Sequence, residues 1–316
     1  MTQIAFVFPG QGSQEVGMGR ALVECYPAAR ELFEQADKIL GFPLGRLCFE
    51  GPEAELNDTI NTQAAIFTAS MAALAALRSA GYTVKPKYVA GHSLGEYSAY
   101  TAAGAVSFED GLRLVRERGR LMKKAGEINP GSMAAILKLD DEVVAQICRD
   151  VTAEGQGLLQ LANYNSPGQV VFSGHHAAVE RGIELAVAAK AKRAVKLPIS
   201  IASHSELMRV ITDEFRAAIH KTPLNLPETP IVANINAEPI DSPEAIRAEM
   251  EGQLTSSVRW TDSVRWLAAH GVAEFVEIGP KNVLTGLIRR IEPEVKVNNI
   301  RTPEDIEAFL GQLAVA

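Results

Sequence analysis

Apolar runs and amphipathic stretches alternate at the start of the chain. The run over residues 3–8 is almost wholly apolar, which predicts a strand buried on both faces. A Gly-rich loop follows, and beyond it Met18, Leu22 and Tyr26 recur at the spacing of a helix. A strand, a loop and a helix in this order predict the first unit of an α/β sheet.

The same order of elements returns further along the chain. An Ala- and Leu-rich helix is expected over 62–79, and Pro86 then breaks the chain before a short strand over 88–90. Helices are expected over 96–103 and, with a strongly amphipathic pattern, over 108–125. Repetition of strand, turn and helix predicts that the strands run parallel.

The middle of the chain has a different pattern. Its apolar runs predict the order β-α-β-β-α-β, which is ferredoxin-like. The expected elements are strand 132–139, helix 141–151, strands 158–164 and 169–173, helix 177–191 and strand 194–199. The α/β pattern then resumes with strands 231–235 and 274–278 and a helix over 283–290. The sequence therefore predicts an α/β fold with a large domain of residues 1–127 and 199–316 and an inserted subdomain of residues 128–198.

Composition narrows the class of protein. Of the 316 residues, 47% are hydrophobic and 22% are charged, which is ordinary for a globular protein. The net charge of -7 is opposite to the bias of a general nucleic-acid binder, so we expect no nucleic-acid partner. Cys25, Cys48 and Cys148 lie far apart, which argues against a disulfide framework and offers no zinc-binding spacing. We therefore expect a reducing, cytoplasmic location.

The sequence predicts neither export nor membrane insertion. The N-terminus lacks a basic region, and its apolar run stops at Pro9. The most apolar later stretch, residues 64–77, contains Thr68 and Ser70 and ends before Arg78. It is too short and too polar for a spanning helix, so we expect a buried helix and no membrane partner.

Residues 91–95 read Gly-His-Ser-Leu-Gly and match the pattern G-x-S-x-G. A nucleophilic serine has to stand exposed at the tip of a sharp turn between a strand and a helix. Glycines on both sides allow that turn without a clash of Cβ atoms. The start of the following helix offers backbone N–H groups to a developing oxyanion. The expected strand before and helix after this segment predict Ser93 as the nucleophile; the alternative is a purely structural turn.

Ser93 needs a base, and the chain contains 6 histidines. His204 lies in a polar segment, residues 200–205, directly after an apolar strand, where the edge of a sheet is expected. Spacing alone leaves His204 open between a base and a helix-capping residue. His92 is expected to point away from Ser93, and no acid stands out as the third member of a triad. The remaining histidines are expected at helix ends: His175, His176, His220 and His270.

Six short motifs follow one another along the chain. They are Pro-Gly-Gln-Gly-Ser-Gln at 9–14, Gly-His-Ser-Leu-Gly-Glu at 91–96, Arg-Gly at 118–119, Asn-Ser-Pro-Gly-Gln at 165–169, Ser-His at 203–204 and Glu-Ile-Gly-Pro at 277–280. Together they resemble the malonyl-CoA:acyl-carrier-protein transacylases of fatty-acid synthesis, over essentially the whole chain. The resemblance implies an α/β-hydrolase-like domain with an inserted ferredoxin-like subdomain. It also implies transfer of malonyl from malonyl-CoA to the phosphopantetheine thiol of acyl carrier protein, through a malonyl-serine ester.

The resemblance also implies roles for single residues. Ser93 matches the nucleophile that forms the ester, and His204 matches the general base. Backbone N–H groups of Gln11 and Leu94 match the oxyanion hole. Arg118 matches the arginine that pairs with the free carboxylate of malonyl. The residues alone allow Gln11 as a turn residue, Leu94 as a packed helix start, and Arg118 as one more solvated charge on a basic helix.

In this family a backbone carbonyl, at a position that matches Gln253, takes the place of the missing acid. The match is carried by residues 253–260, and an ordinary surface position is the alternative for Gln253. Gln63 and Asn165 match polar positions that line the family's pocket, with a capping or turn role as the alternative for each. The resemblance implies no cofactor and no metal, because the substrate carries CoA and the acceptor carries phosphopantetheine.

The carrier proteins of such systems are acidic, and this chain is acidic too, so docking needs a local basic patch. The candidate residues are Lys190, Lys192, Arg193, Lys196, Arg289 and Arg290. A solvated helix end is the alternative for these residues. We expect the chain to act as a monomer.

Two other functions fit part of these residues. A serine hydrolase, such as an esterase or thioesterase, would share Ser93 and His204 but would leave a buried arginine unexplained. A non-catalytic module that docks carrier proteins would need neither the serine nor the histidine. The residues do not distinguish a carrier protein of fatty-acid synthesis from one of polyketide synthesis, although a free-standing chain favours the former.

Overall fold

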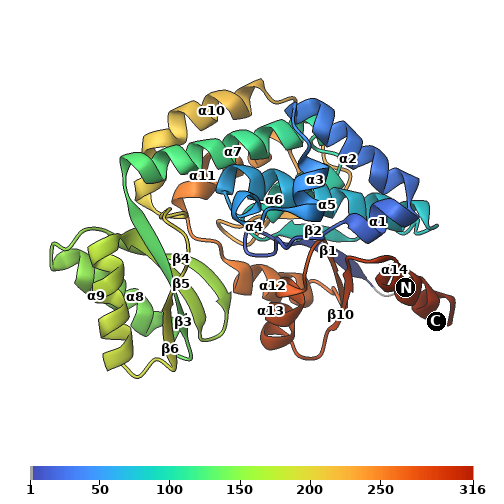
Figure 1. Ribbon diagram of the computed structural model, residues 1–316. Coiled ribbons are helices and arrows are strands. Elements are labelled where there is room, and N and C mark those ends of the chain that lie inside the picture. Colours follow the sequence, from blue (N-terminus) through green and yellow to red (C-terminus); the bar gives the residue numbers. More distant parts are fainter. Residues whose placement is uncertain (1–2, 316) are drawn as a thin grey trace.

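The computed structural model describes residues 3–315, which form two β-sheets and the helices packed on them (Figure 1). The larger one, sheet A, has its strands in the order β10-β9-β1-β2-β7-β8. These strands are β1 (Ile4–Phe8), β2 (Tyr88–Gly91), β7 (Ile231–Val232), β8 (Pro239–Ile240), β9 (Glu274–Ile278) and β10 (Lys296–Ile300). Neighbouring strands run parallel, except for the antiparallel pair β7 and β8. The carboxyl ends of β1, β2 and β9 therefore meet at one edge of sheet A.

Strand β1 lies in the interior of sheet A and is buried on both faces. Ile4, Phe6 and Phe8 belong to the hydrophobic core on one face, while Ala5 and Val7 belong to the core on the other. This division follows from the two-residue period of a strand. An apolar residue at every position thus lets one strand join two cores, as the sequence pattern predicted.

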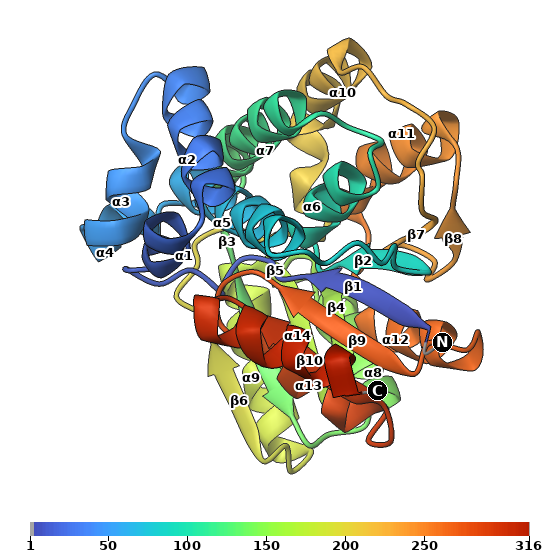
Figure 2. The ribbon, with the colours of Figure 1, turned by 90° about the vertical axis from the view of Figure 1, so that its right-hand side faces the viewer.

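Helices cover both faces of sheet A (Figure 1, Figure 2). The helices that share the core of one face include α2 (Pro27–Leu40), α5 (Thr59–Ser79), α6 (Gly95–Ala102), α7 (Phe108–Ile128), α10 (Thr212–Lys221) and α11 (Pro243–Gly252). Those that share the core of the other face are α12 (Trp260–Ala269) and α13 (Val283–Ile291). By length and composition α5 could cross a membrane, yet 83% of its most apolar window is buried inside the fold. It is the core helix that the sequence predicted.

Sheet B is the smaller sheet and lies to one side of sheet A (Figure 1). Its strand order is β4-β5-β3-β6, and all neighbouring strands run antiparallel. Its elements follow in the order β3 (Gly131–Leu137), α8 (Asp141–Ala153), β4 (Leu159–Ser166), β5 (Gln169–His175), α9 (His176–Ala188) and β6 (Arg193–Lys196). The strands share a core of their own with α8 and α9. This is the β-α-β-β-α-β order that the apolar runs predicted.

Short helices complete the fold. They are α1 (Arg20–Cys25), α3 (Leu44–Glu50), α4 (Glu53–Leu56), α14 (Pro303–Val315) and two 3₁₀ helices, η1 (Glu206–Ile211) and η2 (Gln253–Thr255). The periodicity of Met18, Leu22 and Tyr26 predicted one helix, but Met18 lies in a turn and Tyr26 is extended between α1 and α2. The next helix begins at Pro27, because proline fits the first turn of a helix but cannot continue one.

Two expected strands are shorter in the structure. The strand expected over 231–235 ends at Val232, and β6 ends at Lys196 instead of residue 199. In the first case the backbone N–H of Asn234 donates to two buried carboxylates, those of Glu96 and Glu249, instead of to a neighbouring strand. The apolar pattern was therefore right about burial and wrong about pairing at residues 233–234, whereas β6 is largely exposed.

Candidate active site

Ser93 lies at the tip of the turn between β2 and α6. Its φ of 52° is in the left-handed region, which side chains other than glycine rarely adopt. The glycines on either side are required by close packing. A Cβ on Gly95 would overlap the carbonyl oxygen of Phe8, and one on Gly91 would overlap the backbone of Gly95. The turn is therefore sharp, and it presents the hydroxyl of Ser93 at the carboxyl edge of sheet A.

Asn234, which follows β7, fixes this turn from the side. Its Oδ1 accepts a hydrogen bond from the backbone N–H of Ser93 at 2.7 Å, and its Nδ2 donates to the carbonyl oxygen of Gly91 at 2.7 Å. The side chain of Asn234 thus bridges the turn and holds Ser93 in its left-handed conformation by two hydrogen bonds. The sequence analysis missed Asn234, since it lay inside the strand expected over 231–235.

His204 faces the hydroxyl of Ser93. The distance from its Nε2 to Ser93 Oγ is 2.7 Å. Its Nδ1 lies 3.0 Å from the carbonyl oxygen of Gln253 and 3.1 Å from that of Ser256. Because carbonyl oxygens only accept hydrogen bonds, Nδ1 carries the proton and the lone pair of Nε2 is free to take one from Ser93. The carbonyl of Gln253 lies where the resemblance implied, and that of Ser256 was not anticipated.

The imidazole of His204 stays neutral over a wide pH range. Burial, together with the positive charge of Arg118, lowers the pKa of His204 to about 3. A neutral imidazole is the form that can act as a base. The φ of His204 is 58°, also left-handed, so both members of the pair are held in uncommon backbone conformations.

Arg118 projects from α7 into the same site and is fully buried. Its Nη2 donates to Ser93 Oγ at 3.0 Å and to Gln253 Oε1 at 2.8 Å, and its Nη1 donates to Gln63 Oε1 at 2.8 Å. The guanidinium carbon lies 5.3 Å from the centre of the Tyr97 ring. Every hydrogen-bond acceptor that Arg118 finds within residues 3–315 is neutral. The alternative of a solvated charge is therefore wrong, and the buried cation is available to an anion.

Gln11 and Leu94 offer two backbone N–H groups beside Ser93. Gln11 lies in the loop after β1, and Leu94 is the residue that precedes α6. Within residues 3–315 neither N–H donates a hydrogen bond. The loop after β1 approaches the nucleophile turn closely, since a Cβ on Gly10 would overlap the carbonyl oxygen of His92. Two free donors at this place are the arrangement that an oxyanion requires.

Gln63 and Asn165 lie in different surroundings. Gln63, buried in α5, accepts from Arg118 and has its Nε2 3.5 Å from Gln11 Oε1, so it belongs to the group around Arg118. Asn165, on β4, instead has its Oδ1 2.8 Å from Nε2 of His92. His92 therefore points away from Ser93, as expected, and joins the nucleophile turn to sheet B.

The remaining histidines lie apart from Ser93. Nδ1 of His175 accepts the N–H of Leu158 at 2.9 Å, and Nε2 of His220 lies 2.8 Å from Glu251. His270 stacks on a tryptophan, and His176 is exposed as the first residue of α9. Among the histidines, only His204 lies within hydrogen-bond distance of Ser93 in the part of the chain that the structure describes.

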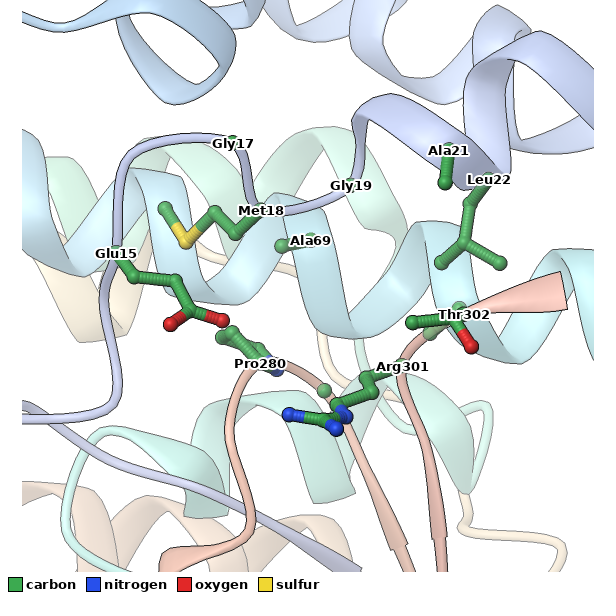
Figure 3. A pocket seen from close by; sticks show the side chains of 12 residues that line it. Glu15, Gly17, Met18, Gly19, Ala21, Leu22, Ala69, Pro280, Arg301 and Thr302 are labelled. Carbon is green, nitrogen blue, oxygen red and sulfur yellow. The ribbon is translucent and has the colours of Figure 1, made fainter. Parts of the chain in front are cut away.

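Two cavities lie near the carboxyl edge of sheet A. One of about 810 Å³ is lined by Gln11, Thr59 and Ile201 among others, so it opens beside the expected oxyanion hole. The second, of about 100 Å³, lies beyond the ends of β9 and β10, and Met18 and Arg301 are among the residues around it (Figure 3). The larger cavity thus borders the loop after β1, which approaches the nucleophile turn.

Comparison with known proteins identifies relatives over the full chain. The family model described as "Acyl transferase domain" matches residues 5–302. The chain is 44% identical over 313 residues to the malonyl CoA-acyl carrier protein transacylase of Bacillus subtilis, covering 99% of this chain and 98% of the relative. The structure of acyl-carrier-protein S-malonyltransferase from Bartonella henselae superposes with a TM-score of 0.95, at 44% identity and 99% coverage of each chain. A malonyl-transacylase in complex with a type II polyketide-synthase carrier protein gives a TM-score of 0.95, at 39% identity, covering 98% of this chain and 100% of that one.

Proposed function

The chain belongs to the acyl transferase family, and from this membership we propose that it moves malonyl from malonyl-CoA to acyl carrier protein, as an S-malonyltransferase of fatty-acid synthesis. One observation carries the proposal for the site. Ser93 Oγ lies 2.7 Å from His204 Nε2 and 3.0 Å from Nη2 of the buried Arg118. A nucleophile, a base and a cation without an anion thus meet at one point, as transfer of an acyl group with a free carboxylate requires.

The first half-reaction loads Ser93. Neutral His204 accepts the Ser93 proton at Nε2 while Oγ attacks the thioester carbon of malonyl-CoA. The N–H groups of Gln11 and Leu94 then stabilise the negative oxygen, and one such donor contributes roughly 2.7–4 kcal/mol in the transition state. When the intermediate collapses, the C–S bond breaks and His204 returns the proton to the CoA sulfur. Malonyl-Ser93, free CoA and neutral His204 remain.

The second half-reaction unloads Ser93 by the same steps in reverse order. His204 accepts the proton of the phosphopantetheine thiol, and the sulfur attacks the ester carbon. The C–O bond breaks, and the proton returns to Ser93 Oγ. Because each half-reaction is complete in itself, the kinetics are ping-pong. The sequence of steps needs no cofactor besides the groups that the substrates carry.

Arg118 accounts for the choice of acyl group. Acetyl-CoA is smaller than malonyl-CoA, so no pocket that admits malonyl can exclude it by size. A buried guanidinium discriminates because an acetyl group leaves its charge unpaired, and sites of this kind reject analogues by roughly 10⁴. Arg118 can pair with the malonyl carboxylate without losing an ion pair first.

Two basic segments are candidates for docking an acidic carrier protein. One contains Lys190, Lys192 and Arg193 after α9, and the other contains Arg289 and Arg290 at the end of α13. Lys196, also a candidate, pairs with Glu180 at 3.0 Å. The free thiols of Cys25, Cys48 and Cys148 support a cytoplasmic location.

Intact-mass measurement after incubation with malonyl-CoA alone tests the proposal. We expect one malonyl adduct that maps to Ser93 and disappears when acyl carrier protein is added. Ser93→Ala should lose the adduct, while Ser98→Ala, which removes another buried hydroxyl, should keep it. Steady release of CoA without any carrier protein would instead identify a hydrolase, and absence of an adduct would identify a non-catalytic module.

A further inference from the structure

Two buried carboxyl groups lie beneath the nucleophile turn. Glu96 is on α6 and fully buried, and Glu249 is on α11 and 7% exposed. Both accept the same backbone N–H, that of Asn234, at 2.8 Å to Glu96 Oε1 and 3.0 Å to Glu249 Oε1. Because one N–H reaches both oxygens, the two carboxyl groups are immediate neighbours. The mechanism above uses neither of them.

Two adjacent buried carboxyl groups cannot both be ionised. Burial and the neighbouring carboxyl raise the pKa of Glu96, and burial raises that of Glu249, so the pair retains one proton. Glu96 also accepts from Nδ2 of Asn234 at 3.1 Å and from Nε2 of Gln253. Glu249 accepts only backbone N–H groups, those of Asn234 and Ile235. Both oxygens of Glu96 therefore act as hydrogen-bond acceptors, Oε1 towards Asn234 and Oε2 towards Gln253.

The side chain of Gln253 connects this pair to Arg118. Its Nε2 donates to Oε2 of Glu96 and, at 3.0 Å, to the carbonyl oxygen of Ser93. Its Oε1 accepts from Nη2 of Arg118 at 2.8 Å. An amide has its donor and its acceptor on opposite sides. Oε2 of Glu96 and the carbonyl oxygen of Ser93 both accept from Nε2, so together they turn the NH₂ of Gln253 inward and its oxygen towards the guanidinium.

We propose that Glu96, packed against the neighbouring carboxyl group of Glu249, is a positioning residue that orients Gln253 and thereby holds Arg118 ready for the substrate carboxylate. The inference rests on the proposed malonyl transfer and adds to it the reason why Arg118 keeps its place without an ion pair. The carboxyl group of Glu96 lies one amide away from the guanidinium. Arg118 therefore keeps neutral contacts that a malonyl carboxylate can outcompete.

Glu96→Gln tests the orientation directly. Asn234 donates to Oε1 of Glu96 and Gln253 donates to Oε2, and the amide of the variant has an oxygen at only one of these two positions and an NH₂ at the other. Gln253 then loses its partner or turns its NH₂ towards Arg118. We expect kcat/KM for malonyl-CoA to fall about tenfold or more, mainly through KM, and that for acetyl-CoA to change less than about threefold. An unchanged ratio of malonyl to acetyl transfer would overturn the proposal.

Glu249→Gln is the matched control, because Glu249 accepts from the backbone of Asn234 and Ile235 and, within the described residues, makes no hydrogen bond to Gln253. We expect this variant to keep the malonyl-to-acetyl ratio of the parent enzyme. In an Arg118→Ala background, Glu96→Gln should lower malonyl transfer by less than about twofold more, since it acts through Arg118. A full tenfold additional loss there would show a structural role and overturn the proposal.

Two further measurements keep the outcomes separate. If Glu96→Gln does not fold, Gln253→Met gives the same test, because it removes the amide but keeps the carbonyl that holds His204. Its malonyl-to-acetyl ratio should fall by a similar factor, and an unchanged ratio would contradict the proposal. The labelling rate of Ser93 by a fluorophosphonate, which has no carboxylate to pair with Arg118, should fall by a smaller factor than malonyl transfer in Glu96→Gln. If the parent enzyme formed no malonyl adduct, the proposed function itself would be wrong. If the parent formed the adduct and the variants kept its malonyl-to-acetyl ratio, only this inference would be wrong.

Discussion

Sheets A and B differ in how deeply their strands are buried and in what they contribute to the site. All 5 residues of β1 are buried, whereas β6 has 3 of its 4 residues exposed. The loops at the edge of sheet A carry Gln11 and Ser93, and α7 adds Arg118 from the layer that covers it. Sheet B contributes Asn165, which bonds to His92. Groups that need fixed positions to within an ångström thus come from the part of the fold with a core on each face.

Sheet B still acts on the site indirectly. Strand β4 bonds to the segment before α12, with the N–H of Tyr164 donating to the carbonyl oxygen of Val258 at 2.9 Å and the N–H of Val258 donating to that of Ala162 at 2.8 Å. The same segment carries the carbonyl groups of Gln253 and Ser256 that hold His204. Sheet B therefore supports His204 through the backbone, while sheet A positions Ser93.

The largest effect should come from the buried cation that the sheet A layer provides. In Arg118→Ala we expect malonyl transfer to fall about 10³-fold or more, with acetyl or longer acyl transfer increased relative to malonyl, because the carboxylate loses its partner. Rates with a series of acyl-CoA substrates measure this. Arg113→Ala, on the same helix but in an exposed pair with Glu109, is the control and should leave the rates unchanged. Unchanged malonyl selectivity in Arg118→Ala would remove Arg118 from the pocket.

A comparison of two glycines tests the difference in packing. Gly95→Ala at the edge of sheet A should destabilise the fold by about 3 kcal/mol or more, because its Cβ meets the Phe8 carbonyl. Gly155→Ala, in the loop after α8 beside sheet B, has open space and a φ of 77°. It should cost only about 1 kcal/mol from the left-handed backbone. Urea unfolding of the two variants measures both values, and equal losses would contradict the contrast.

The pH dependence of stability should reveal the buried imidazoles. The folded-state pKa of His204 is about 3, whereas a histidine in the unfolded chain has a pKa of about 6.5. The unfolded state then binds more protons between these values, so stability should fall as pH is lowered from about 6.5 towards 3. Buried His92, whose pKa is also lowered, acts in the same direction. Urea unfolding between pH 7 and pH 5 should show a smaller decline in His204→Ala than in the parent chain.

The rate of Ser93 malonylation should respond differently from stability. Because His204 is already neutral, we expect the single-turnover rate to stay level from about pH 8 to pH 5. A fall in this rate centred at about pH 6.5 would show that His204 is a solvated imidazole with an ordinary pKa. Such a result would contradict the buried geometry described for His204.

The smallest effect is expected on the exposed side, next to sheet B. Lys190→Glu combined with Lys192→Glu should raise the KM for acyl carrier protein by about fivefold, because steering of an acidic partner weakens. The KM for malonyl-CoA should not change. Lys38→Glu on α2, an exposed residue in the layer over sheet A, is the control and should leave both constants unchanged. An equal rise of KM for the carrier in the control would refute a local docking patch.

The sequence predicted what depends on local pattern. The apolar run of β1, the turn around Ser93 and the element order of sheet B each have a periodicity or a motif that is complete within a few residues. Contacts between distant segments could not be predicted in this way. Asn234 lies 141 residues from Ser93, so nothing in the pattern of residues 91–95 indicates that its side chain bonds to this turn.

The buried glutamates illustrate the same limit. Glu96 stands within a motif that the resemblance covers, but its burial depends on α11, which brings Glu249 beside it. A glutamate in the sequence is ordinarily expected at the surface, and only three-dimensional packing shows two of them sharing one N–H. The same reason explains why the residues alone allowed Arg118 as one more solvated charge on α7, although the resemblance implied a place for it in the pocket.

The two carbonyl groups that hold His204 affect which charged groups can pair with Arg118. A carboxylate in their place would be a permanent anion within a few ångströms of Arg118, and the guanidinium could settle on it. Peptide carbonyl groups orient the imidazole ring of His204 but carry no net charge with which Arg118 could form an ion pair. Under the proposed function, the way His204 is held thus leaves the guanidinium free to pair with the carboxylate of the acyl group.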